Sequence, residues 1–219
     1  MQLYVGRSSL RGDLAKYARR LNLLEIKAEP GRLPRGARLR GWRKAVPEGF
    51  VFSVVLPRSA GELLADAPID PAISAAEALE ASWFLLQTPA TVMPGARTLR
   101  RLEALKQRLP GDRRLAWEPR GVWEDEVADR AARDLGLYLV RDLAQRPAPP
   151  RDEVVYTRLL ALGEGARVRQ GAIERLAESL EGVREAFVVI EGEGAVRAAQ
   201  ALPELLGTEG LTQDPSTGV

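Results

Sequence analysis

The residues of this chain that could do chemistry are carboxylates and arginines that interrupt or end short apolar runs. Glu25 lies within one such run, and Glu118 ends another. A carboxylate among apolar side chains is costly unless it is paired, and two carboxylates in different environments can divide the roles of acid and base. Glu25 and Glu118 are therefore the candidate catalytic residues. The alternative for Glu25 is a structural ion pair with Arg158 or Lys27.

A second set of side chains suits the binding of a small anionic ligand. Arg120 follows Glu118 with one residue between them, so both side chains can point to the same side of a strand. Arg158 interrupts an apolar run, where a guanidinium needs an acidic partner, either a protein carboxylate or a bound ligand. The predicted ligand-binding residues are Arg120, Arg158, Gln87, Asp142 and Trp123.

The composition excludes several kinds of site. The chain contains no cysteine, which excludes disulfides, a thiolate nucleophile and cysteine-bound metal. It also contains no histidine, which removes the usual general base near neutral pH and the commonest metal ligand. We therefore predict no cofactor and no metal site.

The charge balance bears on the possible partners. The formal net charge is +2, from 32 basic and 30 acidic residues, which does not indicate a strong non-specific nucleic-acid binder. A basic face within a nearly neutral chain stays open as an alternative. No apolar run approaches the roughly 18 residues of a membrane span, and the first residues do not resemble a signal peptide. We expect a cytoplasmic protein without a membrane partner, and the sequence does not indicate an oligomeric state.

The elements that must position these residues alternate along the chain. Apolar runs, rich in β-branched and aromatic residues, predict strands at 3–6, 23–26, 50–56, 83–87, 115–118, 137–140, 154–159 and 187–190. Amphipathic or alanine-rich segments predict helices at 13–21, 39–45, 72–81, 97–108, 123–135, 172–180 and 194–206. The proline-rich stretch 146–152 predicts that the connection 141–153 has no helix.

About eight strands that are apolar on both faces, with helices between most of them, indicate a parallel sheet covered by helices. No glycine-rich nucleotide-binding turn follows any of the strands, which disfavours the nucleotide-binding open sheets. We predict an α/β fold, a single TIM-like β/α barrel over 1–206, followed by a polar tail at 207–219 that frays.

In such barrels the functional groups lie where the strands end. The predicted strand ends hold Arg7, Ser8, Glu25, Lys27, Ser53, Arg58, Gln87, Glu118, Arg120, Arg141, Asp142, Arg158 and Glu191.

An ordered set of segments resembles the domain of unknown function 72 family, also called YecE-like proteins. Segment 14–25 is similar to the family's helix leading into a strand that ends in Glu, and segment 84–90 to its Leu-Gln-x-Pro strand end. The other similar segments are 50–57, 118–123, 155–158 and 187–202. The resemblance implies a TIM-like barrel without an established activity.

Two departures from the family pattern bear on the chemistry. Gly121 and Leu160 stand where the family has histidine. Family chemistry that depends on those histidines is not expected in this chain. The function expected is therefore binding of a small anionic ligand or a partner at the mouth of the barrel. The alternatives are a carboxylate-dependent hydrolase or isomerase using Glu25 and Glu118, and a nucleic-acid-associated protein.

Overall fold

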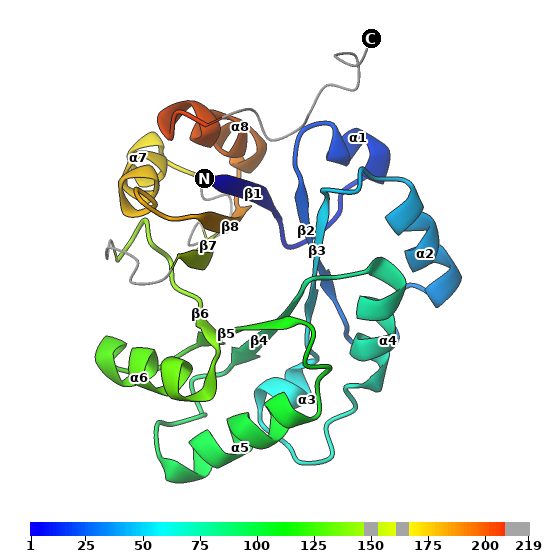
Figure 1. The fold of residues 1–219 in the computed structure, drawn as a ribbon, viewed down its shortest axis with the longest axis vertical. Helices are drawn as coiled ribbons and strands as arrows, with labels where there is room; N and C mark the ends of the chain where they lie inside the picture. Colours follow the sequence, from blue (N-terminus) through cyan, green and yellow to red (C-terminus); the bar gives the residue numbers. More distant parts are fainter. Residues whose placement is uncertain (147–152, 161–166, 209–219) are drawn as a thin grey trace. The chain divides into compact units, whose positions relative to one another are not determined.

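The computed structural model describes residues 1–146, 153–160 and 167–208. Strands and helices alternate along the chain (Figure 1). The strands are β1 (Gln2–Arg7), β2 (Leu23–Lys27), β3 (Val51–Val55), β4 (Trp83–Thr88), β5 (Arg114–Pro119), β6 (Tyr138–Leu139), β7 (Val154–Leu160) and β8 (Glu185–Glu191). The helices are α1 (Leu14–Ala18), α2 (Gly36–Lys44), α3 (Arg58–Gly61), α4 (Asp70–Leu79), α5 (Ala96–Gln107), α6 (Asp125–Leu135), α7 (Gln170–Ser179) and α8 (Ala195–Leu205).

The strands form one sheet in the order β6-β5-β4-β3-β2-β1-β8-β7. The strand pairs β1–β2, β1–β8, β3–β4, β4–β5, β5–β6 and β7–β8 are all parallel. Beyond β6, Arg141 forms an isolated parallel bridge with Thr157 of β7, the strand at the other end of this order. This order, with neighbouring strands joined through helices, is the one expected of a β/α barrel.

The chain divides into two compact units. Unit 1 comprises Met1–Leu24, Ala45–Val51 and the described part of Arg141–Val219, and unit 2 comprises Glu25–Lys44 and Phe52–Val140. Strand β2 belongs to both, because its first two residues pair with β1 in unit 1 and its remaining residues fall in unit 2.

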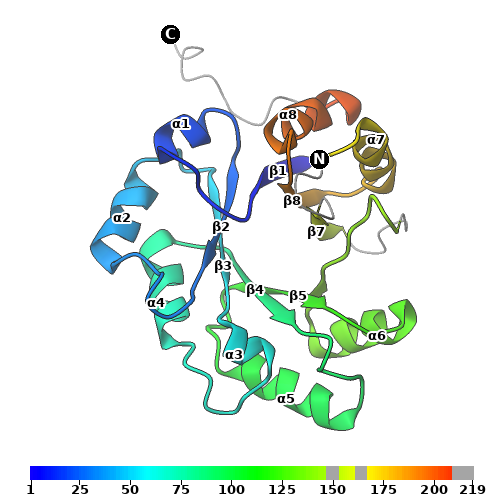
Figure 2. The ribbon, with the colours of Figure 1, turned by 180° about the vertical axis from the view of Figure 1, so that it is seen from behind.

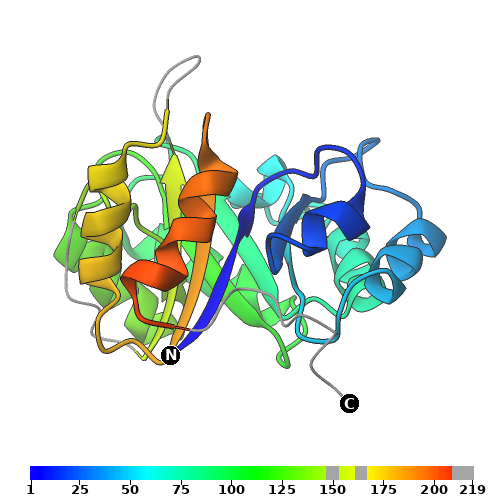
Figure 3. The same cartoon turned by 90° about the horizontal axis from the view of Figure 1, so that it is seen from above.

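Unit 1 is built on β1, β8 and β7, with α7 and α8 running beside one another along these strands (Figure 3). Alternate residues of the strands pack under the helices, among them Val5, Val188 and Ile190. The opposite face carries Tyr4, whose ring stacks on Phe187 with centroids 4.7 Å apart. Both faces of these strands are therefore packed, which explains their continuous apolar character.

Unit 2 contains β4, β5 and all of β3 except its first residue, with α5 and α6 packed against one another beside the strands (Figure 2). The first turn of α6 carries Asp125 and Glu126, which favour a helix N-terminus. The helix ends at Gly136, whose φ of 61° is left-handed and suits a C-cap glycine. Its alanines at 128, 131 and 132 form the buried face and allow close packing.

All eight expected strands and all seven expected helices are present among the described residues, with shifted ends. The predicted helix 13–21 is shorter, because the chain turns after Ala18 to place Leu23 in β2. Helix α3 was not expected. Its residue Gly61 approaches β4 so closely that a Cβ there would clash with the carbonyl oxygen of Gln87. A single helical turn is too short to show a hydrophobic period in sequence.

The connection between β6 and β7 was predicted to have no helix, and its described residues confirm this. Residues 141–146 form no helix, and the Asp142 carboxylate instead accepts hydrogen bonds from the backbone N–H groups of Ala144 and Gln145 at 3.0 and 3.2 Å. Residues 147–152 lie outside the described part of the chain, as do all but two residues of the predicted tail. None of the described helices is long and apolar enough to cross a bilayer.

Candidate functional site

In unit 2, three of the predicted site residues meet at the ends of β4 and β5. Gln87 lies directly opposite Glu118 in the parallel register, and its Nε2 donates a hydrogen bond of 2.6 Å to the carboxylate. Arg120 lies two residues further on, with Nη2 3.9 Å from the other carboxylate oxygen. The side chain of Arg120 is 55% exposed, whereas that of Glu118 is 14% exposed. The amide therefore orients the carboxylate, while most of the guanidinium faces solvent.

The aromatic residue predicted for the site lies beside this trio but is buried. Trp123 is 7% exposed and packs edge to face on Trp117, with ring centroids 4.8 Å apart. Its indole N–H donates to the carbonyl oxygen of Val92 at 2.9 Å, and that of Trp117 donates to the Thr88 hydroxyl at 3.1 Å. Trp123 thus packs the chain beyond β5, and its predicted ligand contact stays a prediction.

Glu25 lies in the part of β2 that belongs to unit 2. It is 1% exposed, which agrees with the buried position that its sequence neighbours indicated. Its predicted role as an acid or base stays a prediction.

Unit 1 holds the remaining two predicted residues, which differ in setting. Arg158 is 5% exposed and pairs in register with Val189 of β8. Glu191 lies two residues beyond Val189, so alternation along the strand places its side chain on the same face of the sheet as that of Arg158. Asp142, in contrast, is engaged in the turn after β6, where it also accepts a 2.7 Å hydrogen bond from the Gln145 side chain.

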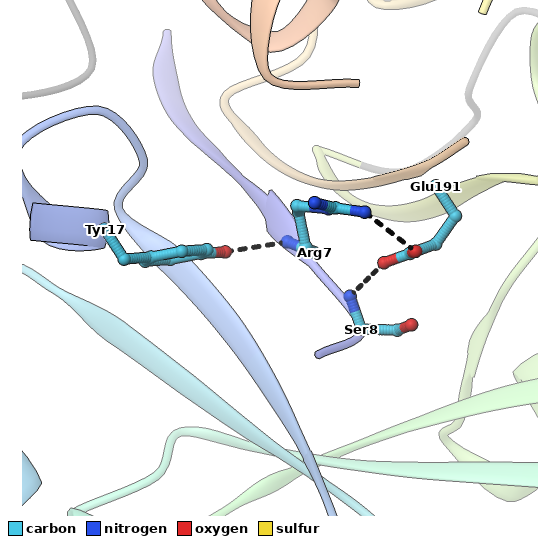
Figure 4. Close-up of polar contacts among 4 residues, drawn as sticks. All are labelled: Arg7, Ser8, Tyr17 and Glu191. Carbon is cyan, nitrogen blue, oxygen red and sulfur yellow. Dashed lines mark hydrogen bonds and ion pairs between the residues drawn. The ribbon is translucent and has the colours of Figure 1, made fainter. Parts of the chain in front are cut away.

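A further polar cluster lies where β1 and β8 end (Figure 4). The Glu191 carboxylate accepts a 2.5 Å hydrogen bond from the backbone N–H of Ser8, and its other oxygen lies 3.5 Å from Nη2 of Arg7. The Tyr17 hydroxyl accepts from the backbone N–H of Arg7 at 2.9 Å and donates to the carbonyl oxygen of Leu23 at 2.6 Å. These contacts join the ends of β1 and β8 and the start of β2 to helix α1.

Arg7 is the least satisfied member of this cluster. Its side chain is only 14% exposed, and the single contact to Glu191 is long for a charged hydrogen bond. Its Nε is buried and has no hydrogen-bond partner in the described part of the chain. A guanidinium has five N–H donors in a planar fork, so Arg7 keeps donors for a planar or tetrahedral anion.

The sequence predicts Arg7, Ser8 and Glu191 at strand ends but does not single them out as site residues, and Tyr17 falls within the predicted helix 13–21. The signal that could have found Arg7 and Glu191 is their position directly after the first and last strands. Closure of a barrel makes these two strands neighbours, and they are paired here.

Near the end of β8, an ion pair between Arg167 and Glu193 shifts the pKa values of both side chains. Arg167 donates a 2.9 Å hydrogen bond to Glu193, which lowers the pKa of the Glu193 carboxyl and raises that of the guanidinium. Both side chains are exposed. No group of three or more acidic side chains in the described ranges is arranged to hold a metal ion.

The comparison with protein families decides the relationship. The chain matches the family described as "Protein of unknown function DUF72" over residues 2–218. It belongs to the DUF72 family. This confirms the resemblance that the ordered segments indicated.

Solved structures of other DUF72 proteins have the same fold. A family member from Enterococcus faecalis V583 is 16% identical, with a TM-score of 0.70, covering 97% of this chain and 99% of that one. One from Thermotoga maritima MSB8 is 15% identical, with a TM-score of 0.70, covering 94% and 100%. A comparison with curated proteins finds no match.

The fold also extends to an enzyme outside the family. D-Psicose 3-epimerase from Clostridium cellulolyticum H10, solved with D-tagatose, is 12% identical, with a TM-score of 0.59, covering 94% of this chain and 98% of that one. Likeness at this identity concerns the fold alone. Together with the strand order, these relatives confirm the expected TIM-like β/α barrel.

Proposed function

We propose that this DUF72 protein binds a small anionic ligand at the carboxyl ends of its strands, with Arg7 as the main contact. The observation that carries the proposal is the buried Nε of Arg7, which has no hydrogen-bond partner among the described residues. A buried donor that is left unsatisfied costs about 1–3 kcal/mol, and a carboxylate or phosphate oxygen is the group that would satisfy it best.

The surroundings of Arg7 support an external anion. Among the described residues, Glu191 is the only carboxylate that contacts Arg7, and one of its oxygens already accepts a hydrogen bond from the backbone N–H of Ser8. The remaining contact, at 3.5 Å, leaves the guanidinium only weakly paired. Arg158 adds a second positive charge on the face of the sheet that also carries Glu191.

Unit 2 offers a second arginine of this kind at its own strand ends. Arg120 is held at its backbone by a hydrogen bond to the carbonyl oxygen of Thr88, and its guanidinium reaches Glu118 only at 3.9 Å. The arrangement leaves the fork accessible and places Gln87 and Glu118 beside it as hydrogen-bonding groups. We keep Arg120 and Gln87 as predicted ligand contacts.

Calorimetry with inorganic phosphate and with citrate tests the proposal. We expect measurable binding by the wild-type chain and a loss of at least about tenfold in Arg7→Lys, which keeps the charge but loses the fork geometry. Arg184→Lys is the matched control, because Arg184 lies exposed before the first residue of β8 in an ion pair with Glu153. No binding of either anion, or equal binding by both variants, would overturn the assignment to Arg7.

The second candidate function is a carboxylate-dependent hydrolase or isomerase that uses Glu25 and Glu118. Two observations favour it. Glu25 is almost fully buried, whereas Glu118 is partly exposed and hydrogen-bonded, so the two carboxylates have different environments. The fold is shared with D-psicose 3-epimerase.

Incubation with D-tagatose, D-psicose and D-fructose, with Glu25→Gln and Glu118→Gln as controls, tests this second candidate function. Turnover that persists in both variants would rule out this pair.

A further inference from the structure

Helix α2 and the chain before it form a strongly basic segment. Residues 32–44 carry six basic side chains and no acidic one, whereas the whole chain has a net charge of only +2. The rest of the chain therefore carries −4. The basic residues are Arg32, Arg35, Arg38, Arg40, Arg43 and Lys44. The nearly neutral total thus conceals a local concentration of positive charge.

Most of these charges are not neutralised by the protein. Arg35, Arg40 and Lys44 are exposed and make no ion pair with any described residue. Arg38 is also exposed, and its guanidinium lies over the ring of Trp42, 5.5 Å from the centroid. A cation–π contact orients a guanidinium without cancelling its charge, so Arg38 remains able to bind an anion.

The neighbouring helix does not supply the missing negative charge. Helix α4 packs against α2, and two exposed acidic residues lie at its C-terminal end, Glu77 on the helix and Glu80 as its C-cap. Neither carboxylate forms an ion pair with a residue of α2 in the described structure. The positive field of α2 therefore points into solvent.

We propose that this segment, residues 32–44, binds nucleic acid through the phosphodiester backbone, independently of the ligand site at the strand ends. Five of the six cations are arginines, whose planar forks match phosphate oxygens in pairs. Helix α2 (Gly36–Lys44) is about 14 Å long, a length that faces about eight charges of a duplex. Phosphate contacts alone carry no sequence information, so the binding is sequence-independent.

The distribution of apolar side chains favours nucleic acid over an anionic membrane. A helix that lies in a membrane interface buries a broad apolar face in the lipid. In α2 the leucine is 1% exposed, packed inside the protein, and Trp42 is half-buried. None of the large exposed hydrophobic residues of the described chain lies on α2. The helix thus offers charge to a partner but no apolar surface.

Fluorescence anisotropy with labelled 20-nucleotide DNA and RNA, single-stranded and duplex, tests the proposal at increasing NaCl. The test variant is the triple substitution R35A/R38A/R40A. The control is R97A/R100A/R101A on α5, which removes three exposed arginines and changes the net charge equally. For four to six phosphate contacts we expect a slope of log K against log salt of about −4 in the wild type. The α2 variant should lose about two to three units of this slope and at least tenfold in affinity, while the α5 variant stays within about threefold.

A second variant distinguishes a loss of charge from a loss of the folded structure. R35K/R38K/R40K keeps the charge and should keep most of the salt dependence, and circular dichroism should show the same helix content for all variants. Equal losses in the α2 and α5 alanine variants, or no binding at 50 mM NaCl, would overturn the proposal. So would binding to phosphatidylglycerol vesicles that depends on α2 in the absence of nucleic-acid binding.

Discussion

At the residue scale, the side chains at the strand ends differ in how fully the protein itself satisfies them. Asp142 has its oxygens engaged by the turn that it stabilises, and Glu118 is oriented by Gln87 at 2.6 Å. The Arg7 side chain is largely buried, yet its one contact with a carboxylate in the described part of the chain is the long one to Glu191. A buried donor without a hydrogen-bond partner in the described chain calls for an explanation, and a bound anion is the one that we propose for Arg7.

Replacing Glu191 by Gln tests this reading of Arg7. The substitution removes the charge that partly balances the guanidinium, so we expect a loss of about 1–2 kcal/mol in the free energy of unfolding, since both side chains keep some contact with solvent. Phosphate at 10 mM should restore more stability to this variant than to the wild type, because it replaces the lost negative charge. Urea denaturation with and without phosphate measures both effects. A phosphate effect equal in the two proteins would contradict the prediction.

The contact between Arg167 and Glu193 predicts a pH dependence. The hydrogen bond lowers the pKa of Glu193 in the folded state, so the pair stabilises the fold when the carboxyl is ionised. That contribution is present above the unfolded-state pKa and is lost as the pH falls through the lower folded-state value. An NMR titration of the Glu193 carboxyl should give a depressed pKa, and Arg167→Ala should raise it. An unchanged titration in that variant would show that the contact is not formed in solution.

At the element scale, two glycines differ in the space around them, Gly6 in a closely packed strand pair and Gly41 on an open part of a helix. A Cβ at Gly6 of β1 would clash with the backbone of Leu23 in β2, so this strand pair needs glycine. Gly41 lies inside α2, and apart from its chain neighbours and the backbone of its own helix no described heavy atom lies within 4 Å of the position of a Cβ. The same residue type is therefore required in the strand and merely tolerated in the helix.

The two glycines give opposite predictions for substitution by alanine. Gly6→Ala should destabilise the chain by about 1–3 kcal/mol, since the strands must separate. Gly41→Ala should stabilise it by about 0.5–1 kcal/mol, because alanine is the better helix former. Thermal and urea unfolding of both variants measure the difference. A destabilised Gly41→Ala variant would mean that the exposed side of α2 is covered in solution.

The sequence predicts elements well where hydrophobic period and length are clear, and less well at their ends. Runs such as 50–56 and 83–87 correspond closely to β3 and β4, because strands buried on both faces are continuous apolar segments. Helix α3 was missed, since one turn that depends on the contact between Gly61 and β4 has no local pattern. The Asp13 side chain caps α1 by accepting from the backbone N–H of Lys16, so the helix starts where expected, but it ends at Ala18, three residues before the predicted end.

At the scale of the whole molecule, strand–helix alternation was sufficient to predict the barrel, because few topologies accommodate eight buried parallel strands joined by helices. Which side chains contact one another was harder to predict from the sequence. Glu118 and Arg120 are near in sequence, and their proximity was predicted, whereas Arg7 and Glu191 are 184 residues apart and meet only through the register of β1 and β8. Register depends on the assembled sheet, so the sequence alone identified the strand ends but not this cluster.

The central claim is that an anion binds at Arg7, and its position can be measured directly. Crystals grown without sulfate or phosphate and soaked in selenate would locate the anion by the anomalous scattering of selenium. We predict a peak at hydrogen-bonding distance from Nε of Arg7, absent in crystals of Arg7→Lys. Selenate bound elsewhere with none at Arg7, or a second protein carboxylate occupying the donors of Arg7, would show that Arg7 is not the anion-binding residue.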